Sequence, residues 1–355
     1  KYFARSTVIE DFPTPPFVDE IAIFSITNKL TYNFHIYMRY LITSALPYAN
    51  APLHIGHVLE IVQTDVWVRS LKLAGNNVFY YCASDTHGTP IMLKAQELNT
   101  TPEELSKKYK KLHSDTYKSY NIDLNNFHTT HSKENKELTE HFFNSAYEKG
   151  DIYTKEIEQL FDEQKNIFLS DRFVKGECPS CGAKDQYGDA CEVCGKTYDA
   201  LDLKNPYSTL SNSEPVIKKS KHYFFKLNNF KEFLNETVSE ISNQDPIKEK
   251  LKEWFDSGLK DWDISRDEPY FGFKIPNEDS KYLYVWLDAP IGYLSSIKNW
   301  CDSNNIDFND FINDSKIVHF IGKDIVYFHL LFWPATLKAA NFPIPNEVYL
   351  SLIHI

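Results

Sequence analysis

Four cysteines within a short stretch are the most chemically specific feature of the sequence. They form the pairs Cys178-x2-Cys181 and Cys191-x2-Cys194, and a glycine follows each pair. Two such pairs place four thiolates at the corners of a tetrahedron, the geometry that suits Zn²⁺. Because sulfur fills all four positions, we predict a structural zinc site and not a catalytic one. Iron–sulfur ligation is a weaker alternative, and disulfide pairing is weaker still.

A second candidate is the segment His54-Ile55-Gly56-His57, which starts a predicted helix. Residues three apart in a first turn project from one face, where unpaired backbone N–H groups and the helix dipole attract phosphate. Two imidazoles could add directional hydrogen bonds to phosphate oxygens. Gly56 removes a side chain where a flat ring could press on the backbone. A single histidine is more often structural, but a strand and a proline-rich turn precede this pair in the order that a nucleotide site requires.

Four further residues could belong to a substrate site. Asp85 follows a predicted strand, and a carboxylate there suits an ammonium group, although a capping role is the ordinary alternative. Arg266 offers a planar fork that matches phosphate or carboxylate, with a surface salt bridge as its alternative. Trp286 and Tyr293 surround small residues, but in isolation they would be assigned to the core.

The elements that must position these residues alternate between strand and helix. We predict strands at 40–46 and 78–83 and helices at 54–73 and 90–98. This order indicates an α/β fold with a doubly wound parallel sheet. Residues 101–150 look helical and polar, the cysteines lie in an irregular region at about 151–263, and strand-like runs return at 282–287 and 317–321. The simplest organisation is a nucleotide-binding domain split by an insertion.

Several blocks together resemble the bacterial methionyl-tRNA synthetases, a family of class I aminoacyl-tRNA synthetases. Residues 45–57 (ALPYANAPLHIGH) are similar to the first signature of that family, and 82–90 (CASDTHGTP), 284–293 (YVWLDAPIGY) and 319–329 (HFIGKDIVYFH) match later ones. The resemblance implies a Rossmann-like catalytic domain split by a zinc-knuckle connective insertion. It also implies ATP-dependent activation of L-methionine, with Mg²⁺ accompanying ATP, and transfer of the methionyl group to tRNA(Met).

The same resemblance assigns roles to individual residues. It implies that His54, His57 and Arg266 take part in catalysis. It implies that ATP is bound by His54, Gly56, His57, Gly322 and Asp324. It implies that methionine is bound by Leu46, Tyr48, Asp85, Trp286, Ala289, Pro290, Tyr293, Ile325 and His329. Zinc would be bound by Cys178, Cys181, Cys191 and Cys194.

The predicted organisation has five parts. Residues 1–37 are an unmatched N-terminal extension, with Met38 as a hypothetical start of translation, and 38–150 form the first half of the catalytic domain. The insertion spans 151–263 with its zinc knuckle at 174–197, the second catalytic half spans 264–345, and 346–355 are an unmatched tail. The resemblance stops before the lysine-rich KMSKS loop, so we expect a truncated chain with weak or no activity. The alternatives are an inactive zinc-containing tRNA-binding fragment and a related synthetase for leucine, isoleucine, valine or cysteine.

Bulk composition excludes little. The chain has 355 residues, 42% of them apolar, and a net charge of −11, which neither indicates nor excludes a nucleic-acid partner because phosphate contacts are local. The cysteine pattern favours a reducing compartment, so we expect a cytoplasmic protein. No run approaches the roughly 20 apolar residues that span a bilayer, and we expect no membrane association. The oligomeric state is left open.

Overall fold

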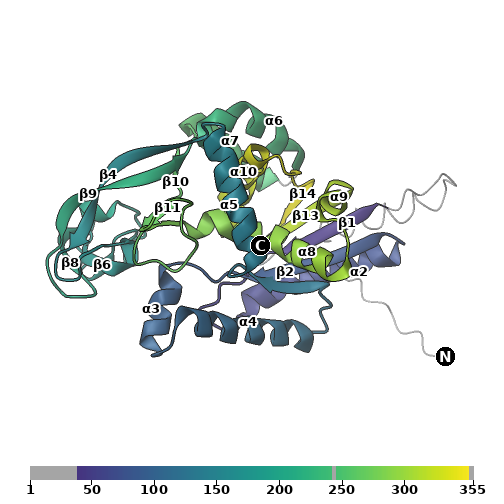
Figure 1. The fold of residues 1–355 in the computed structure, drawn as a ribbon, viewed down its shortest axis with the longest axis horizontal. Coiled ribbons are helices and arrows are strands. Elements are labelled where there is room, and N and C mark those ends of the chain that lie inside the picture. Colours follow the sequence, from purple (N-terminus) through teal and green to yellow (C-terminus); the bar gives the residue numbers. More distant parts are fainter. Residues whose placement is uncertain (1–37, 242–244, 352–355) are drawn as a thin grey trace, which may run out of the picture.

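The computed structural model of the chain describes residues 38–241 and 245–351 (Figure 1). The predicted extension 1–37 and residues 352–355 of the predicted tail lie outside the described residues. Among the residues that are described, no helix is long and apolar enough to cross a membrane.

A five-stranded parallel sheet forms the centre of the catalytic part. Its strand order is β14-β13-β1-β2-β3, with the bounds Glu347–Leu350, Ser315–Ile321, Arg39–Ser44, Asn77–Ser84 and Asn126–Thr129. The surrounding helices are α2 (Ile55–Leu73), α3 (Thr89–Glu97), α4 (Pro102–Ser119), α5 (Lys133–Glu148), α8 (Val285–Asn304), α9 (Phe308–Asn313) and α10 (Trp333–Ala340). The predicted parallel α/β fold is confirmed.

Helices cover both faces of this sheet because its strands alternate their apolar side chains. Leu41 and Tyr81 enter a core with α5, α8, α9 and α10, whereas Tyr40, Ile42 and Tyr80 enter a second core with α2 and α4. Such strands are buried on both sides, as a doubly wound sheet requires. β1 pairs with β2 on one side and with β13 on the other, so the chain changes direction beside β1. Ligands bind at such a switch point, beyond the carboxyl ends of the strands.

The region inserted between α5 and α8 is largely antiparallel and extends away from the parallel sheet (Figure 1). Its larger sheet has the order β10-β9-β4-β5, with the bounds Trp262–Asp263, Val216–Phe225, Ile152–Asp162 and Ile167–Phe168. A smaller sheet, β7-β6-β8, comprises Gln186–Tyr187, Val174–Glu177 and Lys204–Ser208, and the cysteines flank its strands. The helices α6 (Lys231–Ile241) and α7 (Asp245–Ser257) and the hairpin β11 (Ser265–Asp267) and β12 (Lys281–Leu283) complete it. Phe225 and Leu234 share one core with Phe143 of α5 and Leu330, so the insertion packs on the catalytic part.

Three sequence expectations need correction. The polar region 101–150 contains the strand β3, whose short polar sequence NFHT lacks an apolar run. The predicted strand at 282–287 ends at Leu283, and α8 begins at Val285 with Pro290 inside it. A short apolar run can form either a strand or a helix, and here it forms a helix although a proline removes one of the helix hydrogen bonds. Finally, the tail predicted from residue 346 contains β14, which pairs with β13 as the edge strand of the sheet.

Candidate active site and metal centre

A cavity of about 380 Å³ lies beyond the carboxyl ends of β1 and β2, against the first turns of α8. All nine residues predicted to bind methionine line it: Leu46, Tyr48, Asp85, Trp286, Ala289, Pro290, Tyr293, Ile325 and His329. Arg266 lines the same cavity from β11. The fold therefore brings together side chains that are separated by up to 283 residues of sequence between Leu46 and His329.

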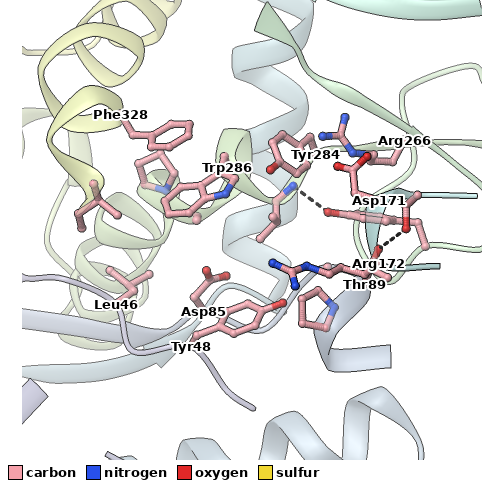
Figure 2. A pocket seen from close by; sticks show the side chains of 18 of the residues that line it. Leu46, Tyr48, Asp85, Thr89, Asp171, Arg172, Arg266, Tyr284, Trp286 and Phe328 are labelled. Carbon is pink, nitrogen blue, oxygen red and sulfur yellow. Dashed lines mark hydrogen bonds between the residues drawn. The ribbon is translucent and has the colours of Figure 1, made fainter. Parts of the chain in front are cut away.

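Asp85 supplies a buried carboxylate to this cavity, beneath the Trp286 ring and beside Tyr48 (Figure 2). Its backbone N–H donates to the Pro47 carbonyl at 3.0 Å, which fixes the end of β2 against the turn after β1. Burial raises the pKa of the Asp85 carboxyl well above its ordinary value, and the charge of Asp288 adds to the rise. One carboxylate oxygen, Oδ1, is buried without a hydrogen-bond partner among the described residues. A cation placed there would stabilise the ionised carboxylate.

Aromatic rings form the wall opposite Asp85. The Trp286 ring stacks on Phe328, with 4.2 Å between the ring centroids and 10° between the planes (Figure 2). Gly292 allows α8 to approach Leu46, because a Cβ at that glycine would lie 2.6 Å from Leu46 Cδ2. The wall is apolar and closely packed, which suits an uncharged side chain.

The inner end of the cavity is polar, but its polar groups bind each other. The Tyr293 hydroxyl lies 2.9 Å from His329 Nε2, and His329 Nδ1 lies 3.0 Å from the Ile325 carbonyl. A carbonyl only accepts, so the ring proton sits on Nδ1 and the Tyr293 hydroxyl donates to Nε2. Burial lowers the pKa of His329 to about 4, which keeps the ring neutral at ordinary pH.

The outer end of the cavity carries charged groups, of which sequence reasoning found only Arg266. The Arg266 guanidinium packs over the Tyr284 ring at 3.7 Å from the centroid. Asp171 and Arg172 from the insertion lie at the same end (Figure 2), and Arg172 pairs with Asp189 at 2.9 Å. No motif spacing pointed to Asp171, Arg172 or Asp189, because their place at the cavity depends on how the insertion folds back over the sheet.

His54 and His57 do not line the cavity; they form the start of α2. The His54 ring accepts a hydrogen bond from the Gly56 N–H through Nδ1 at 3.1 Å, and His57 Nδ1 accepts from the His54 N–H at 3.2 Å. Each ring therefore carries its proton on Nε2 when neutral. The rings stack with centroids 3.8 Å apart. Burial, helped by the neighbouring His54, lowers the pKa of His57 to about 4.

Gly322 and Asp324 also lie outside the cavity lining, directly after β13. Gly322 faces α2, since a Cβ on it would lie 3.8 Å from Glu60 Oε2. Glu60 is a buried acid that sequence reasoning missed; its Oε1 accepts the Ala45 N–H at 2.9 Å, and burial raises the pKa of Glu60 to about 7. Its place beside the buried Ile61 was the available signal, because an acid on the core face of a helix is unusual.

The four predicted metal ligands come together, with all Sγ atoms within 4.8 Å of one another. The two pairs have the same local structure. The Cys181 N–H faces Cys178 Sγ at 3.5 Å, and the Cys194 N–H faces Cys191 Sγ at 3.4 Å. Each turn closes on a glycine with positive φ, Gly182 at 74° and Gly195 at 71°. All four cysteines are free thiols, so the disulfide alternative finds no support in the structure.

Comparisons with known proteins agree with this geometry. The family model described as tRNA synthetases class I (M) matches residues 40–352, which includes β14 and corrects the expected end of the resemblance at residue 345. The chain is 52% identical over 312 residues to the methionine–tRNA ligase of Vesicomyosocius okutanii, covering 87% of the chain and 57% of that protein. It is 52% identical over 328 residues to the methionine–tRNA ligase of a Psychrobacter species, covering 87% of the chain and 47% of that protein. The chain thus spans about half the length of the curated relatives it matches.

A solved structure shows the same fold. The structure of the Mycobacterium tuberculosis methionyl-tRNA synthetase in complex with methionyl-adenylate matches with a TM-score of 0.67 and 20% identity. The match covers 88% of this chain and 57% of that one.

Proposed function

Because the chain belongs to the class I tRNA synthetase family whose methionine (M) model it matches, we propose that it is the catalytic part of a methionine–tRNA ligase. The observation that carries the proposal is a cavity in which a buried carboxylate faces an aromatic wall, and one oxygen of that carboxylate has no hydrogen-bond partner among the described residues. A zwitterionic amino acid with an uncharged side chain has the chemistry to fill it.

In the proposed complex the methionine ammonium group binds the Asp85 carboxylate. The thioether chain lies among Leu46, Trp286, Ala289, Pro290 and Ile325, with Tyr293 and His329 at its end. Tyr293 and His329 donate to other protein atoms, so shape would select the side chain more than hydrogen bonding would. A polarisable thioether is a weak acceptor, which fits such a pocket.

The activation step joins this cavity to the histidine face of α2. The methionine carboxylate attacks the α-phosphorus of ATP, the new C–O–P bond forms, and pyrophosphate leaves with the electron pair of the broken P–O bond. The Nε2–H groups of His54 and His57 would donate to phosphate oxygens, and Arg266 would add positive charge near the triphosphate. Gly322 and Asp324 would face the nucleoside. Mg²⁺ would accompany ATP and neutralise phosphate charge. In the cytoplasm, a hydroxyl of the 3′-terminal ribose of tRNA(Met) would then attack the carbonyl carbon of the adenylate, so that the methionyl ester forms and AMP leaves with the electron pair of the broken C–O bond.

The cysteine cluster fits a structural Zn²⁺. Four thiolates that lie close enough together to surround one ion are a preferred donor set for zinc, and they leave no open position for substrate. We propose that Cys178, Cys181, Cys191 and Cys194 hold this ion and so hold the small sheet of the insertion together.

ATP–pyrophosphate exchange with each of the twenty amino acids tests the proposal. It should be run on this chain and on a version extended at its C-terminus to the length of the relatives. Methionine-dependent exchange in the extended version is expected. Exchange with leucine, isoleucine, valine or cysteine in place of methionine would identify a different synthetase, and tRNA binding without any exchange would favour an inactive fragment.

A further inference from the structure

Directly behind the proposed ammonium site lies a buried histidine–aspartate pair to which neither the motifs nor the proposed chemistry assigns a role. His87 and Asp288 have no exposed surface, and His87 Nδ1 lies 2.7 Å from Asp288 Oδ2 across 201 residues of sequence. His87 belongs to the turn between β2 and α3, whereas Asp288 belongs to the first turn of α8. The pair therefore joins the two sides of the cavity, the side that presents Asp85 and the side that presents Trp286.

The backbone of His87 contacts both polar groups on the first side. Its carbonyl accepts the Tyr48 hydroxyl at 2.7 Å. Its backbone N–H, with that of Thr86, opposes the rise in the pKa of the Asp85 carboxyl. Gly88, the next residue, has φ +108°, and a Cβ there would lie 3.0 Å from the Tyr48 hydroxyl, so this turn is tightly constrained.

The ring of His87 is held on every side that the structure describes. Nε2 lies 3.0 Å from His131 Nδ1, and the ring meets Phe273 nearly edge-on with centroids 4.6 Å apart. Asp288 Oδ2 also lies 3.4 Å from Asn135 Nδ2. A ring so enclosed cannot rotate without breaking a buried hydrogen bond, which is costly.

We propose that His87 and Asp288 are positioning residues: their hydrogen bond fixes the spacing between the carboxylate that receives the substrate ammonium group and the aromatic wall that receives its side chain. The inference rests on the proposed function, since it takes the cavity to bind an amino acid. Neither residue needs to touch the substrate. The pair would act by holding Asp85 and Tyr48 at a set distance from Trp286.

A pair that sets a distance makes a specific prediction about ligand length. S-methyl-L-cysteine has the same ammonium, carboxylate and thioether groups as methionine but is one methylene shorter. When the pair holds the Asp85 carboxylate at its full distance from the aromatic wall, the protein should bind methionine more tightly than S-methyl-L-cysteine. Loosening the pair should weaken methionine binding more than binding of the shorter ligand, so that the ratio of the two dissociation constants falls.

The test is titration of the whole chain with methionine, S-methyl-L-cysteine and ATP, followed by Trp fluorescence or calorimetry, for the wild type and four variants. His87→Ala should raise the Kd for methionine about tenfold, the effect of one buried hydrogen bond, with less than about threefold change for the shorter ligand. The Kd for ATP should stay within about twofold. His87→Asn should restore methionine binding to within about threefold, because its amide can donate to Asp288 from nearly the same place as Nδ1. Asp288→Asn should lie between the two, since its amide oxygen still accepts.

The matched control is His128→Ala, which removes another histidine–acid pair, at 3.3 Å from Glu134, that does not contact the Asp85 turn. It should leave all three dissociation constants within about twofold. The proposal is overturned if His87→Ala binds methionine like the wild type, if it loses all three ligands equally, or if His87→Asn gives no rescue. If His87→Ala does not fold, Asp288→Asn and His87→Asn still test the proposal. An unchanged ratio of the dissociation constants for methionine and S-methyl-L-cysteine in Asp288→Asn overturns the inference. A wild type that binds no methionine would instead contradict the proposed function.

Discussion

The cavity beside Asp85 and the histidine pair at the start of α2 lie at the same edge of the parallel sheet, yet they are built in opposite ways. In the cavity the polar side chains mostly bind other protein atoms, as Tyr48 does with the His87 carbonyl and Tyr293 with His329. In the histidine pair both rings use Nδ1 to accept from the backbone, so each neutral ring carries its proton on Nε2, and His54 is exposed. A preformed shape suits the selection of an uncharged side chain, whereas open directional donors suit a phosphate that brings its own charge. Specificity and chemistry can therefore be disrupted separately.

The largest expected effect is on the cavity side, at Asp85. Replacing it with Asn removes the only charge proposed to meet the substrate ammonium group and leaves that group buried without a counter-charge. Loss of one partner of such a buried pair costs about 2–5 kcal/mol, so the Kd for methionine should rise at least about thirtyfold. Calorimetry measures this directly, and ATP binding should change little. Asp302→Asn, which removes an exposed carboxylate paired with Lys298, is the control and should have no effect.

His57→Ala tests the other side of the comparison. Removing one preorganised donor to a developing phosphate charge lowers a rate by about 10²–10³, so methionine-dependent ATP–pyrophosphate exchange should fall by that factor. The Kd for methionine should remain within about twofold, because His57 does not line the cavity. The comparison fails if His57→Ala weakens methionine binding as much as exchange. The experiment is run in whichever form of the protein, this chain or a C-terminally extended version, shows wild-type exchange.

Loss of the proposed zinc ion should affect the cavity only at its outer end. Cys194→Ser removes one thiolate, and metal analysis should show zinc falling from about one per chain to a small fraction of that. The released turn adjoins Asp189, which pairs with Arg172 at the rim of the cavity. We therefore expect methionine affinity to fall severalfold, well short of the Asp85 effect. Ser180→Ala, which lies between Cys178 and Cys181 in the other cysteine turn and removes no thiol, is the control. Zinc retained in full by Cys194→Ser would contradict the ligand set.

The two regions also differ in how far the sequence alone predicted them. His54, Gly56 and His57 are adjacent in sequence, so helical spacing was enough to predict their shared face. The cavity residues come from separate segments of the sequence. Only the resemblance of those segments to a known family predicted that Leu46, Asp85 and Trp286 belong to one site. Local chemistry is readable from spacing, whereas a site assembled by tertiary packing is not.

The same limit explains the residues that were missed. Asp171 and Arg172 reach the cavity because the insertion folds back over the sheet, and no periodic pattern records that contact. β14 was missed because its pairing with β13 is parallel and depends on the rest of the sheet. In contrast, the clustering of the four cysteines was predicted, since two cysteines separated by two residues carry their geometry in their spacing.

The smallest expected effect concerns pH and distinguishes His329 from the open histidines. Burial lowers the pKa of His329 to about 4 in the folded chain, against an ordinary value of 6.5, so between these values the unfolded chain binds the extra proton. Stability contributed by the neutral ring is therefore complete above about pH 6.5 and is lost as pH falls towards 4, at about 1.4 kcal/mol per pH unit. At pH 5 this amounts to about 2 kcal/mol, a decrease of several degrees in Tm. His329→Gln, which stays neutral and can still accept from Tyr293, should reduce the decrease in Tm between pH 7 and pH 5 relative to the wild type. The surface variant His141→Gln should not, and an equal pH dependence in His329→Gln and the wild type would show that the cavity does not hold this ring in its neutral form.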